Sequence, residues 1–451
     1  MVTGMQIIFG IYILIVAGFA VDILLREMNT YRAMCRIAII ACVPPLGILL
    51  YVVDGRRSRI RSRIRYRRPS HRHHSGLPQL IHNLCSEPLT LHNRIIPLHN
   101  ADTTYTAIIR AMQRAKRSVY LCYYIFIDDR IGRVLCNILE RKARAGVKVY
   151  VIYDDVGSWQ LRRATITRLR RAGVDIRPFK PLWSNLLNGV ARRNHRKIAI
   201  IDSHIAFTGG INIAERYIDG DSLGRWRDEH LSIEGDAVAR LQRVFARDWA
   251  LCGGNPRVVQ NTDFVHSITD SSPLQIVWND EDDNRQTLLD TYTATFVRAE
   301  RTIRISTPYF IPPQGIFDAL RIALASGVKV ELMIPERGDS RLTALISESY
   351  IRAIEQAGAS IYRYANGFLH SKVIIIDDQV ASVGTANLDY RSLCENLEVS
   401  ALIYDRKVIA DLREQFERNK LECQTTDGQV SNPSAAKRLL EAVARLLSPL
   451  L

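Results

Sequence analysis

The sequence predicts an α/β protein in which two copies of one domain follow an N-terminal membrane anchor. Three observations predict it: a length of 451 residues, which exceeds what one hydrophobic core usually holds; two apolar runs at the start; and later stretches that resemble one another at a nearly constant offset. Apolar residues make up 47% of the chain and charged residues 24%. These are globular averages, so they exclude a mostly disordered chain, a collagen and a channel with many spans.

The two apolar runs come first. Residues 5–25 are almost wholly apolar, with Asp22 near the end, and residues 37–53 form an uncharged run that contains Pro44 and Pro45. Each run approaches the roughly 20 residues that a helix needs to cross about 30 Å of hydrocarbon. The first run lacks the basic start and the cleavage site of a secretory signal. We therefore expect a transmembrane helical hairpin over residues 1–54, with a single span or a re-entrant second segment as the alternative.

A block of arginines follows the second run. It has eight members and no acidic residue among them, at positions 56, 57, 59, 61, 63, 65, 67 and 68. By the positive-inside rule, such a block stays in the cytoplasm, and it also attracts anionic lipid headgroups. Most of the net charge of +15 falls in the first 80 residues, which hold twelve Lys/Arg and three Asp/Glu. We read residues 55–90 as a basic juxtamembrane linker and expect no nucleic-acid partner, because the block is tethered beside a bilayer.

Beyond residue 90 the chain alternates helical and strand patterns and repeats itself. Residues 115–127 resemble residues 299–311, a Gly-Val-Lys-Val stretch at Gly146 recurs at Gly327, and an Ala-Gly pair at Ala172 recurs at Ala357. In each copy a helical pattern ends at a glycine and a β-branched run follows. We expect one domain over residues 91–262, its second copy over residues 263–430, and an amphipathic helix over residues 431–451.

A motif with chemistry occurs once in each copy. The pattern is H-x-K-x-x-x-x-D, followed after six residues by G-[GT]-x-N, with the same internal spacing both times. Its members are His195, Lys197, Asp202 and Asn212 in the first copy and His370, Lys372, Asp377 and Asn387 in the second. One H-x-K alone would be weak, but its recurrence inside a detected repeat makes coincidence remote.

The apolar run after each lysine predicts a strand, so the motif histidine and lysine share a face. Asp202 and Asp377 lie seven positions beyond their histidines, about 23 Å along an extended strand and on the opposite face. We therefore expect these aspartates at the strand end, away from the histidines.

A two-residue turn at Ser203 and His204 would fold the next strand back. This register sets Asn212 opposite His195 and Gly210 opposite Lys197, and the same turn in the second copy sets Asn387 opposite His370 and Thr385 opposite Lys372. A slip of one residue would reverse the faces.

Two imidazoles, two ammonium groups and two amides suit a phosphodiester. The lysines, Asn212, Asn387 and Thr385 would hold the phosphate oxygens. One histidine would attack phosphorus, and the other would act as general acid and base. No cysteine or histidine cluster has the spacing of a zinc site, so we expect neither a metal nor another cofactor.

Each histidine needs a partner on its other ring nitrogen to fix its tautomer. Acidic residues follow each motif in a polar stretch, and our candidates are Asp228 after the first motif and Glu395 after the second. Ordinary surface carboxylates are the alternative interpretation.

These residues resemble those of the phospholipase D superfamily, and nearly the whole chain is similar to bacterial cardiolipin synthases. Besides both motifs, the resemblance rests on the segments that begin at Pro44, Tyr123, Tyr153, Gly209, Trp226, Thr307 and Ser448. It implies a tandem pair of phospholipase D-like α-β-α sandwich domains with mixed sheets.

The resemblance also implies the reaction, in which two phosphatidylglycerols give cardiolipin and glycerol through a phosphohistidine. It makes His195 the nucleophile and His370 the acid and base, an assignment that symmetry could reverse. The implied partners are phosphatidylglycerol and other anionic phospholipids. The implied location is a bacterial inner membrane, multi-pass, with cytoplasmic catalytic domains.

Other functions use the same groups. A hydrolase, a transferase with another alcohol or donor lipid, and a membrane-anchored phosphodiesterase or nuclease all remain alternatives, whereas intact motifs disfavour a silent scaffold.

At the C-terminus, one helical face carries Leu439, Leu440, Val443, Leu446 and Leu447, with Lys437, Arg438 and Arg445 nearby. Packing against the domain and contact with a membrane are equally consistent with this face.

Overall fold

The computed structural model describes residues 4–26, 30–43, 48, 76–181, 192–260, 268–281, 286–425, 434–446 and 448. The chain divides into two compact units. The first comprises Met1–Ile64 with Leu182–Ala191, and the second comprises Arg65–Pro181 with Arg192–Leu451.

Two helices make up the described part of the first unit, α1 (Gly4–Arg26) and α2 (Thr30–Cys42). They pack on one another through Ile23, Ala33 and Ile40. The second helix begins seven residues before the apolar run expected from the sequence and ends ahead of Pro44 and Pro45, because proline and the residue before it disfavour a helix.

No helix in the described residues is both long enough and apolar enough to span a bilayer. The transmembrane hairpin therefore stays a prediction. The arginine block at residues 56–68 lies outside the described residues.

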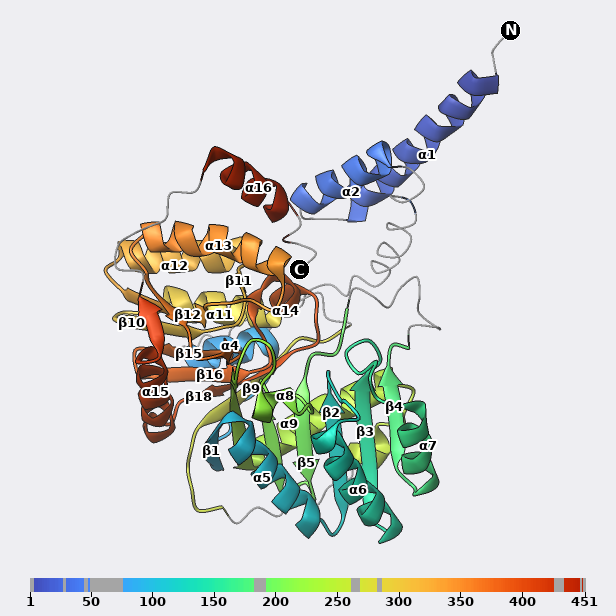
Figure 1. Cartoon of the computed structure of the whole chain (residues 1–451), viewed down its shortest axis with the longest axis vertical. Helices are drawn as coiled ribbons and strands as arrows, with labels where there is room; N and C mark the ends of the chain where they lie inside the picture. Colours follow the sequence, from blue (N-terminus) through green and yellow to red (C-terminus); the bar gives the residue numbers. More distant parts are fainter. Residues whose placement is uncertain are drawn as a thin grey trace. The chain divides into compact units, whose positions relative to one another are not determined.

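The second unit contains two large mixed sheets (Figure 1). The first has the order β1-β8-β6-β5-β2-β3-β4 and the second β19-β13-β12-β10-β15-β16-β18-β9. Strands of the first sheet are β1 (Asn93–His99), β2 (Ser118–Tyr123), β3 (Lys148–Asp154), β4 (Asp175–Phe179), β5 (Lys197–Ile201), β6 (Ile205–Gly209) and β8 (Glu229–Gly235). Those of the second are β9 (Leu274–Trp278), β10 (Thr302–Ser306), β12 (Lys329–Pro335), β13 (Ser360–Tyr364), β15 (Val373–Ile376), β16 (Val380–Gly384), β18 (Val399–Ile403) and β19 (Cys423–Thr425). Parallel pairing joins β2, β3 and β4 in one and β10, β12 and β13 in the other, so the predicted tandem of α/β domains with mixed sheets is confirmed.

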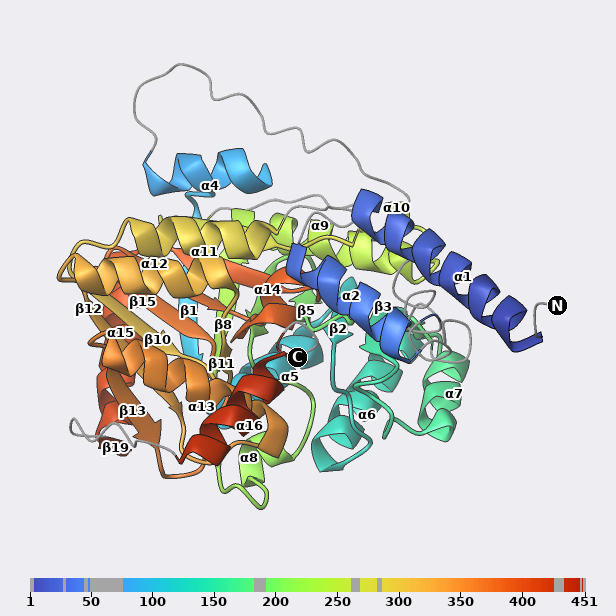
Figure 2. The ribbon, with the colours of Figure 1, turned by 90° about the horizontal axis from the view of Figure 1, so that it is seen from above.

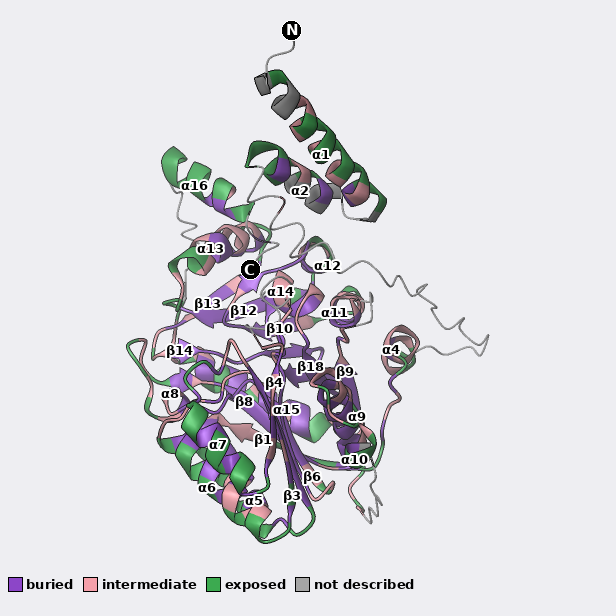
Figure 3. Ribbon diagram, turned by 90° about the vertical axis from the view of Figure 1, so that its right-hand side faces the viewer, coloured by how far each residue is buried: buried purple, intermediate pink, exposed green. Residues whose placement is uncertain are grey.

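Helices cover the sheets in the same way in both copies. One face of the first sheet carries α5 (Asn100–Arg114), α6 (Arg130–Arg144) and α7 (Arg163–Arg171), and the other carries α9 (Asp236–Leu251) (Figure 3). The matching helices of the second sheet are α11 (Thr287–Val297), α12 (Gln314–Ala325) and α13 (Arg341–Gln356), with α15 (Arg406–Lys420) on the other face. Short elements complete the described chain: α4 (Leu77–Cys85), α8 (Arg216–Asp219), α10 (Arg257–Gln260), α14 (Tyr390–Cys394), α16 (Ala435–Arg445), β7 (Trp226–Arg227), β11 (Phe310–Ile311), β14 (Phe368–Leu369) and β17 (Leu388–Asp389).

The two sheets share a hydrophobic core. Along β2, Val119 and Leu121 pack on the outer helices, whereas Tyr120 and Cys122 enter an inner cluster. This alternation follows from the two-residue period of a strand. The inner cluster also contains residues of β15, β16 and β18, so the hydrophobic effect holds the two copies against each other.

The glycines that mark the sequence repeat end helices. Gly146 follows α6 and Gly327 follows α12, each with φ of 87°. This left-handed conformation is strained for residues with a Cβ and is a common end of a helix. The repeated glycine therefore sets where each strand after the helix begins.

The hairpin after each motif histidine is shifted by one residue from the expected register, so that prediction was wrong. Ile201 pairs with Ile205, and the turn is centred on Asp202 and Ser203, both with φ of 54°. His204 becomes an additional loop residue. Aspartate tolerates the left-handed region because its short side chain can hydrogen-bond locally. The second copy turns in the same way.

Candidate active site

Two short backbone links between the copies position the motif histidines. Strand β14 pairs in parallel with β7, and the N–H of His370 donates to the carbonyl of Arg227 at 2.7 Å. On the other side, the N–H of His195 donates to the carbonyl of Leu397 at 3.0 Å. Each histidine backbone is therefore bonded to the residue that precedes an acidic residue of the other copy.

The side chains of the two histidines also contact acidic residues of the other copy. Nδ1 of His370 is hydrogen-bonded to Oδ2 of Asp228 at 2.5 Å. Nδ1 of His195 lies 2.9 Å from Oε1 of Glu398, an ion-pair contact without hydrogen-bond alignment. Asp228 and Glu398 are both buried. Each copy thus supplies one imidazole together with the carboxylate for the imidazole of the other copy.

Glu398 takes the place that the sequence interpretation gave to Glu395. Oε2 of Glu395 lies instead 3.7 Å from Nε of Arg192. One signal in the sequence could have identified Glu398, because it directly precedes the apolar strand β18 as Asp228 directly precedes β8. Choosing by polar surroundings alone missed this equivalence.

Both motif lysines are buried beside the histidines. Nζ of Lys197 donates to the carbonyl of His195 at 2.6 Å, and Nζ of Lys372 donates to the carbonyl of His370. Burial and, to a smaller extent, the charge of Lys372 lower the pKa of Lys197 to about 7 against the attraction of Glu398. Burial lowers the pKa of Lys372 to about 8 against the attraction of Asp228. The mutual influence of these groups shows that both motifs form one electrostatic site.

An aromatic ring lies beside each imidazole. The ring of Tyr124 lies 4.7 Å from that of His195, and the ring of Trp226 lies 5.1 Å from that of His370. Burial lowers the pKa of His195, which Glu398 partly offsets, and burial together with Lys372 lowers that of His370. Burial also raises the pKa of Asp228 to about 7 against the attraction of Lys372. Among the described residues, Nε2 of neither imidazole has a hydrogen-bond partner.

The two asparagines lie beside the site but bond to the protein. Nδ2 of Asn212 donates to the hydroxyl of Tyr217 at 2.6 Å, and its Oδ1 accepts from the N–H of Ile125 at 3.1 Å. Nδ2 of Asn387 donates to Oδ2 of Asp389 at 3.0 Å. The shifted hairpin explains this, because it moves Asn212 out of the position opposite His195.

Thr385 and Gly210 adapt the two copies to different carboxylates. The Thr385 hydroxyl donates to Glu398 and accepts from the N–H of Val399 at 3.0 Å. At the matching position, a Cβ on Gly210 would lie 2.1 Å from Oδ1 of Asp228. The glycine therefore makes room for Asp228, whereas the threonine holds Glu398.

The motif aspartates lie at the far strand ends, as expected. Asp202 accepts from three consecutive backbone N–H groups at the start of β2, and Asp377 does the same at the start of β10. The donors to Asp202 are Lys116, Arg117 and Ser118 at 2.8, 2.7 and 2.9 Å, and those to Asp377 are Glu300, Arg301 and Thr302 at 2.7, 2.8 and 2.7 Å. The prediction that they are strand-end residues is confirmed.

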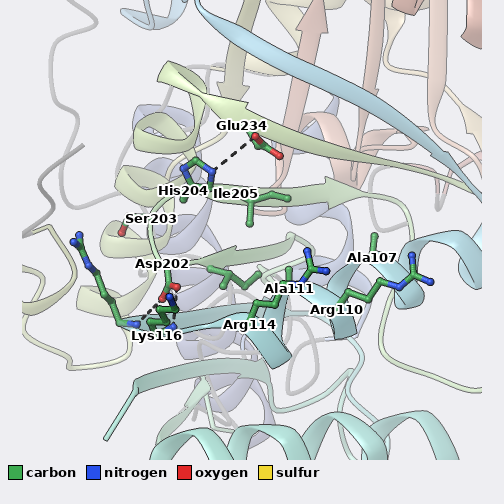
Figure 4. Close-up of a pocket in the computed structure, with 12 residues that line it drawn as sticks. Ala107, Arg110, Ala111, Arg114, Lys116, Asp202, Ser203, His204, Ile205 and Glu234 are labelled. Atoms are coloured by element: carbon green, nitrogen blue, oxygen red, sulfur yellow. Dashed lines mark hydrogen bonds and ion pairs between the residues drawn. The ribbon is translucent and has the colours of Figure 1, made fainter. Parts of the chain in front are cut away.

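Figure 4 shows the end of the first sheet at which Asp202 lies. Asp202 and Lys116 line a cavity of about 960 Å³ there, together with Arg110 and Arg114. His195 precedes β5 and Asp202 follows it, so this cavity lies at the opposite end of the strand from the motif histidine.

Arg196, between the first motif's histidine and lysine, joins the copies in the core. It is fully buried, pairs with Asp248 of α9, and donates from Nε to the carbonyl of Glu398 at 3.3 Å. Its second guanidinium nitrogen donates to the carbonyl of Asn279. The matching residue of the second motif, Ser371, donates to the carbonyl of Arg227 at 3.3 Å.

The described residues contain no group of three or more His, Cys, Asp or Glu side chains that could hold a metal ion. The chemical groups at the site are two imidazole and carboxylate pairs and two ammonium groups. A neutral imidazole can attack phosphorus, and its partner can move a proton, while the lysines balance negative charge. With its tandem mixed sheets, this arrangement defines a phosphodiester-transferring protein of the phospholipase D type.

Comparison with known proteins specifies the family. Residues 108–249 and 292–420, together more than half of the chain, match the family described as "Cardiolipin synthase, PLD-like domain". A cardiolipin synthase of Geobacillus sp. (strain WCH70) is 38% identical over 85% of this chain and 77% of its own. One from Geobacillus kaustophilus is 34% identical over 96% of this chain and 91% of its own. The chain belongs to the cardiolipin synthase family of the phospholipase D superfamily.

Solved structures agree on the fold. A phosphatidylserine synthase from Haemophilus influenzae superposes with a TM-score of 0.61 at 16% identity, over 83% of this chain and 100% of its own. A polyphosphate kinase from Porphyromonas gingivalis gives 0.51 at 14% identity, over 81% of this chain and 54% of its own. At these identities the likeness concerns the fold alone.

Proposed function

We propose that this chain synthesises cardiolipin by transferring the phosphatidyl group of one phosphatidylglycerol to the terminal hydroxyl of a second, releasing glycerol. In the first step, Nε2 of His195 attacks phosphorus and the bond from phosphorus to the glycerol oxygen breaks. The leaving alkoxide takes a proton from His370, which gives glycerol and a phosphohistidine. Lys197 and Lys372 balance the charge on the phosphate oxygens.

In the second step, His370 takes the proton of the hydroxyl on the second phosphatidylglycerol. The resulting oxygen attacks phosphorus, the bond from phosphorus to His195 breaks, and cardiolipin leaves. Both histidines return to their starting protonation states, so no other reactant is consumed.

The observation that carries the proposal is the crossed pairing of imidazoles with buried carboxylates. A carboxylate on Nδ1 fixes the tautomer and orientation of a ring, which leaves Nε2 for chemistry. Asp228 has a pKa of about 7, so near neutral pH its carboxyl group keeps a proton. That proton is donated in the hydrogen bond to Nδ1 of His370. Nε2 of His370 then carries the proton that a general acid donates, which supports His195 as the nucleophile.

The roles of the neighbouring residues are part of the proposal. We assign the phosphate contacts to the two lysines and positioning roles to Asp228 and Glu398. Thr385 acts through Glu398, to which its hydroxyl donates. Asn212 and Asn387 hold the loops beside the site through the bonds described above.

We also propose that the N-terminal helices attach the chain to a bacterial inner membrane as a multi-pass anchor, with the catalytic domains in the cytoplasm. Support comes from the apolar side chains that α1 exposes, among them Leu14, Leu24 and Leu25. The arginines at positions 56–68 support the orientation by the positive-inside rule.

The test is the full-length protein with vesicles of phosphatidylglycerol, followed by mass spectrometry of the lipids and assay of glycerol. We expect cardiolipin and glycerol in equal amounts and neither product from His195→Ala. Phosphatidic acid as the sole lipid product would make the chain a hydrolase, and full turnover by His195→Ala would exclude the mechanism.

A further inference from the structure

The C-terminal helix α16 docks on the second copy with its polar side inward. It lies beside α13 (Figures 1 and 2). The buried residues of α16 are Glu441 and Ala444, and Glu441 pairs with Arg352 of α13. Ala444 packs with Ile311 and Ile346. An ion pair and one small side chain therefore make the contact, not the leucines of the helix.

Most of α16 is exposed (Figure 3), and its exposed residues include the apolar ones. Leu439, Leu440, Val443 and Leu446 are 67, 57, 54 and 56% exposed. Their spacing puts them on one face of the helix. Packing against the domain, one of the two interpretations of this sequence pattern, therefore does not account for the leucines, and a contiguous apolar face of this kind marks an interaction surface.

Charge identifies the kind of partner. Lys437, Arg438 and Arg445 are exposed along the same helix. Among the described residues, none of the three has an ion-pair or hydrogen-bond partner for its charged group. An apolar face bordered by cations is the composition of a helix that lies in the headgroup region of a bilayer with anionic lipids.

The helix lies at the active-site end of the second copy. Ile311, which α16 covers, belongs to β11, and its partner β17 directly follows Asn387. Strand β10 ends at Ser306, which pairs with Val373 next to Lys372. A bilayer in contact with α16 would therefore lie at the end of the sheet that carries the His370 motif.

We propose that the outward face of α16 binds the surface of an anionic bilayer and holds the active site at headgroup level. This inference rests on the proposed function for its choice of substrate lipids. It assigns α16 a contact with the membrane in addition to that proposed for the N-terminal helices.

The experiment places an environment-sensitive fluorescent amino acid at Leu440 in the full-length protein. The control carries the same probe at Val134, an exposed apolar residue of α6, which lies far from α16 in Figure 1. Both proteins are reconstituted in vesicles of phosphatidylglycerol and phosphatidylcholine in which some acyl chains are brominated. Cardiolipin formation in detergent micelles confirms that each labelled protein is folded.

We expect a blue shift and quenching by the brominated lipid at Leu440 but not at Val134. The triple change Lys437→Glu, Arg438→Glu and Arg445→Glu should abolish the quenching at Leu440 and leave activity in micelles intact. Equal responses at the two positions would overturn the proposal. So would shielding of Leu440 from aqueous iodide without quenching by lipid, because a protein partner or a second copy would then cover the face. Quenching without any cardiolipin formation would refute the proposed function and leave the docking surface standing.

Discussion

At the scale of single residues, the site depends on side chains that cross between the copies. His195 meets Glu398 and His370 meets Asp228. Each imidazole therefore has its neighbouring carboxylate in the other copy. Pairing of this kind makes the active site a property of the contact between copies, and each carboxylate can be tested by itself.

Glu398→Gln should lower kcat by roughly 10²-fold with little change in KM. The amide carries no negative charge, so it neither stabilises positive charge on the His195 ring nor fixes the orientation of that ring. Glu395→Gln is the matched control, since Glu395 lies by Arg192 in the same polar stretch, and it should keep the wild-type rate. Steady-state kinetics on phosphatidylglycerol measures both. A larger loss of kcat in Glu395→Gln than in Glu398→Gln would assign the positioning of His195 to Glu395 instead.

The dependence of kcat/KM on pH should be bell-shaped. As pH falls, His195 gains a proton and stops being a nucleophile, and this limb lies below its ordinary pKa of about 6.5 because burial lowers the pKa. As pH rises, Asp228 with a pKa of about 7 loses the proton that it shares with His370, and Lys197 with a pKa of about 7 and then Lys372 with a pKa of about 8 lose the charges that balance the phosphate. Rates measured between pH 5 and 10 at low substrate test this, because kcat/KM reports the free enzyme. A rate still rising at pH 9 would contradict the role of the lysines.

At the scale of elements, the hairpin of each motif ends in an aspartate that ties two strands together. Asp202 caps the backbone at the start of β2 while closing the turn from β5 to β6. Asp377 repeats the arrangement in the second sheet. The third member of the repeated pattern is therefore structural, although it recurs as faithfully as the histidine.

Asp202→Asn should cost about 1–3 kcal/mol of stability, because the amide nitrogen replaces one oxygen that accepts backbone N–H groups. The value of kcat should stay near wild type. Asp228→Asn should do the reverse and lower kcat by roughly 10²–10⁴-fold, because it removes the carboxylate on Nδ1 of His370. Thermal unfolding and turnover of both variants separate the two roles. A greater loss of activity in Asp202→Asn than in Asp228→Asn would contradict the roles assigned to these two aspartates.

At the scale of the whole molecule, a shared core and a buried ion pair hold the copies in register. Arg196 pairs with Asp248 of its own copy and donates to backbone carbonyls of the other. The same guanidinium therefore contacts the backbone of Glu398, whose carboxylate lies beside Nδ1 of His195. Displacement of one copy would separate both histidines from their carboxylates.

Arg196→Met should destabilise the protein by about 3–5 kcal/mol, because it leaves Asp248 buried without its cation. The double variant with Asp248→Leu should recover much of that loss, since an apolar pair can replace a buried ion pair. Ser371→Ala, at the same position of the second motif, should cost less than about 1.5 kcal/mol. Denaturant unfolding compares the three. A loss for Arg196→Met no larger than that for Ser371→Ala would show that the buried pair does not hold the copies together.

The sequence by itself determined the tandem repeat, the mixed α/β character of both copies, the two His/Lys pairs and the strand-end place of Asp202 and Asp377. These follow from local patterns, namely the period of a strand, the glycine at the end of a helix and a spacing that occurs twice. Asp228 was a candidate because of its polar neighbourhood after the first motif, but the structure places it beside His370 of the second motif.

Only the tertiary structure decided which carboxylate meets which histidine, and it replaced Glu395 with Glu398. It also decided the register of the hairpins, which moved Asn212 and Thr385 into contacts with the protein, and the outward direction of the leucines on α16. The physical reason is the same each time. A spacing along the chain fixes the face of an element, whereas the partner on that face is set by how separate elements pack, and here the partners come from the opposite copy.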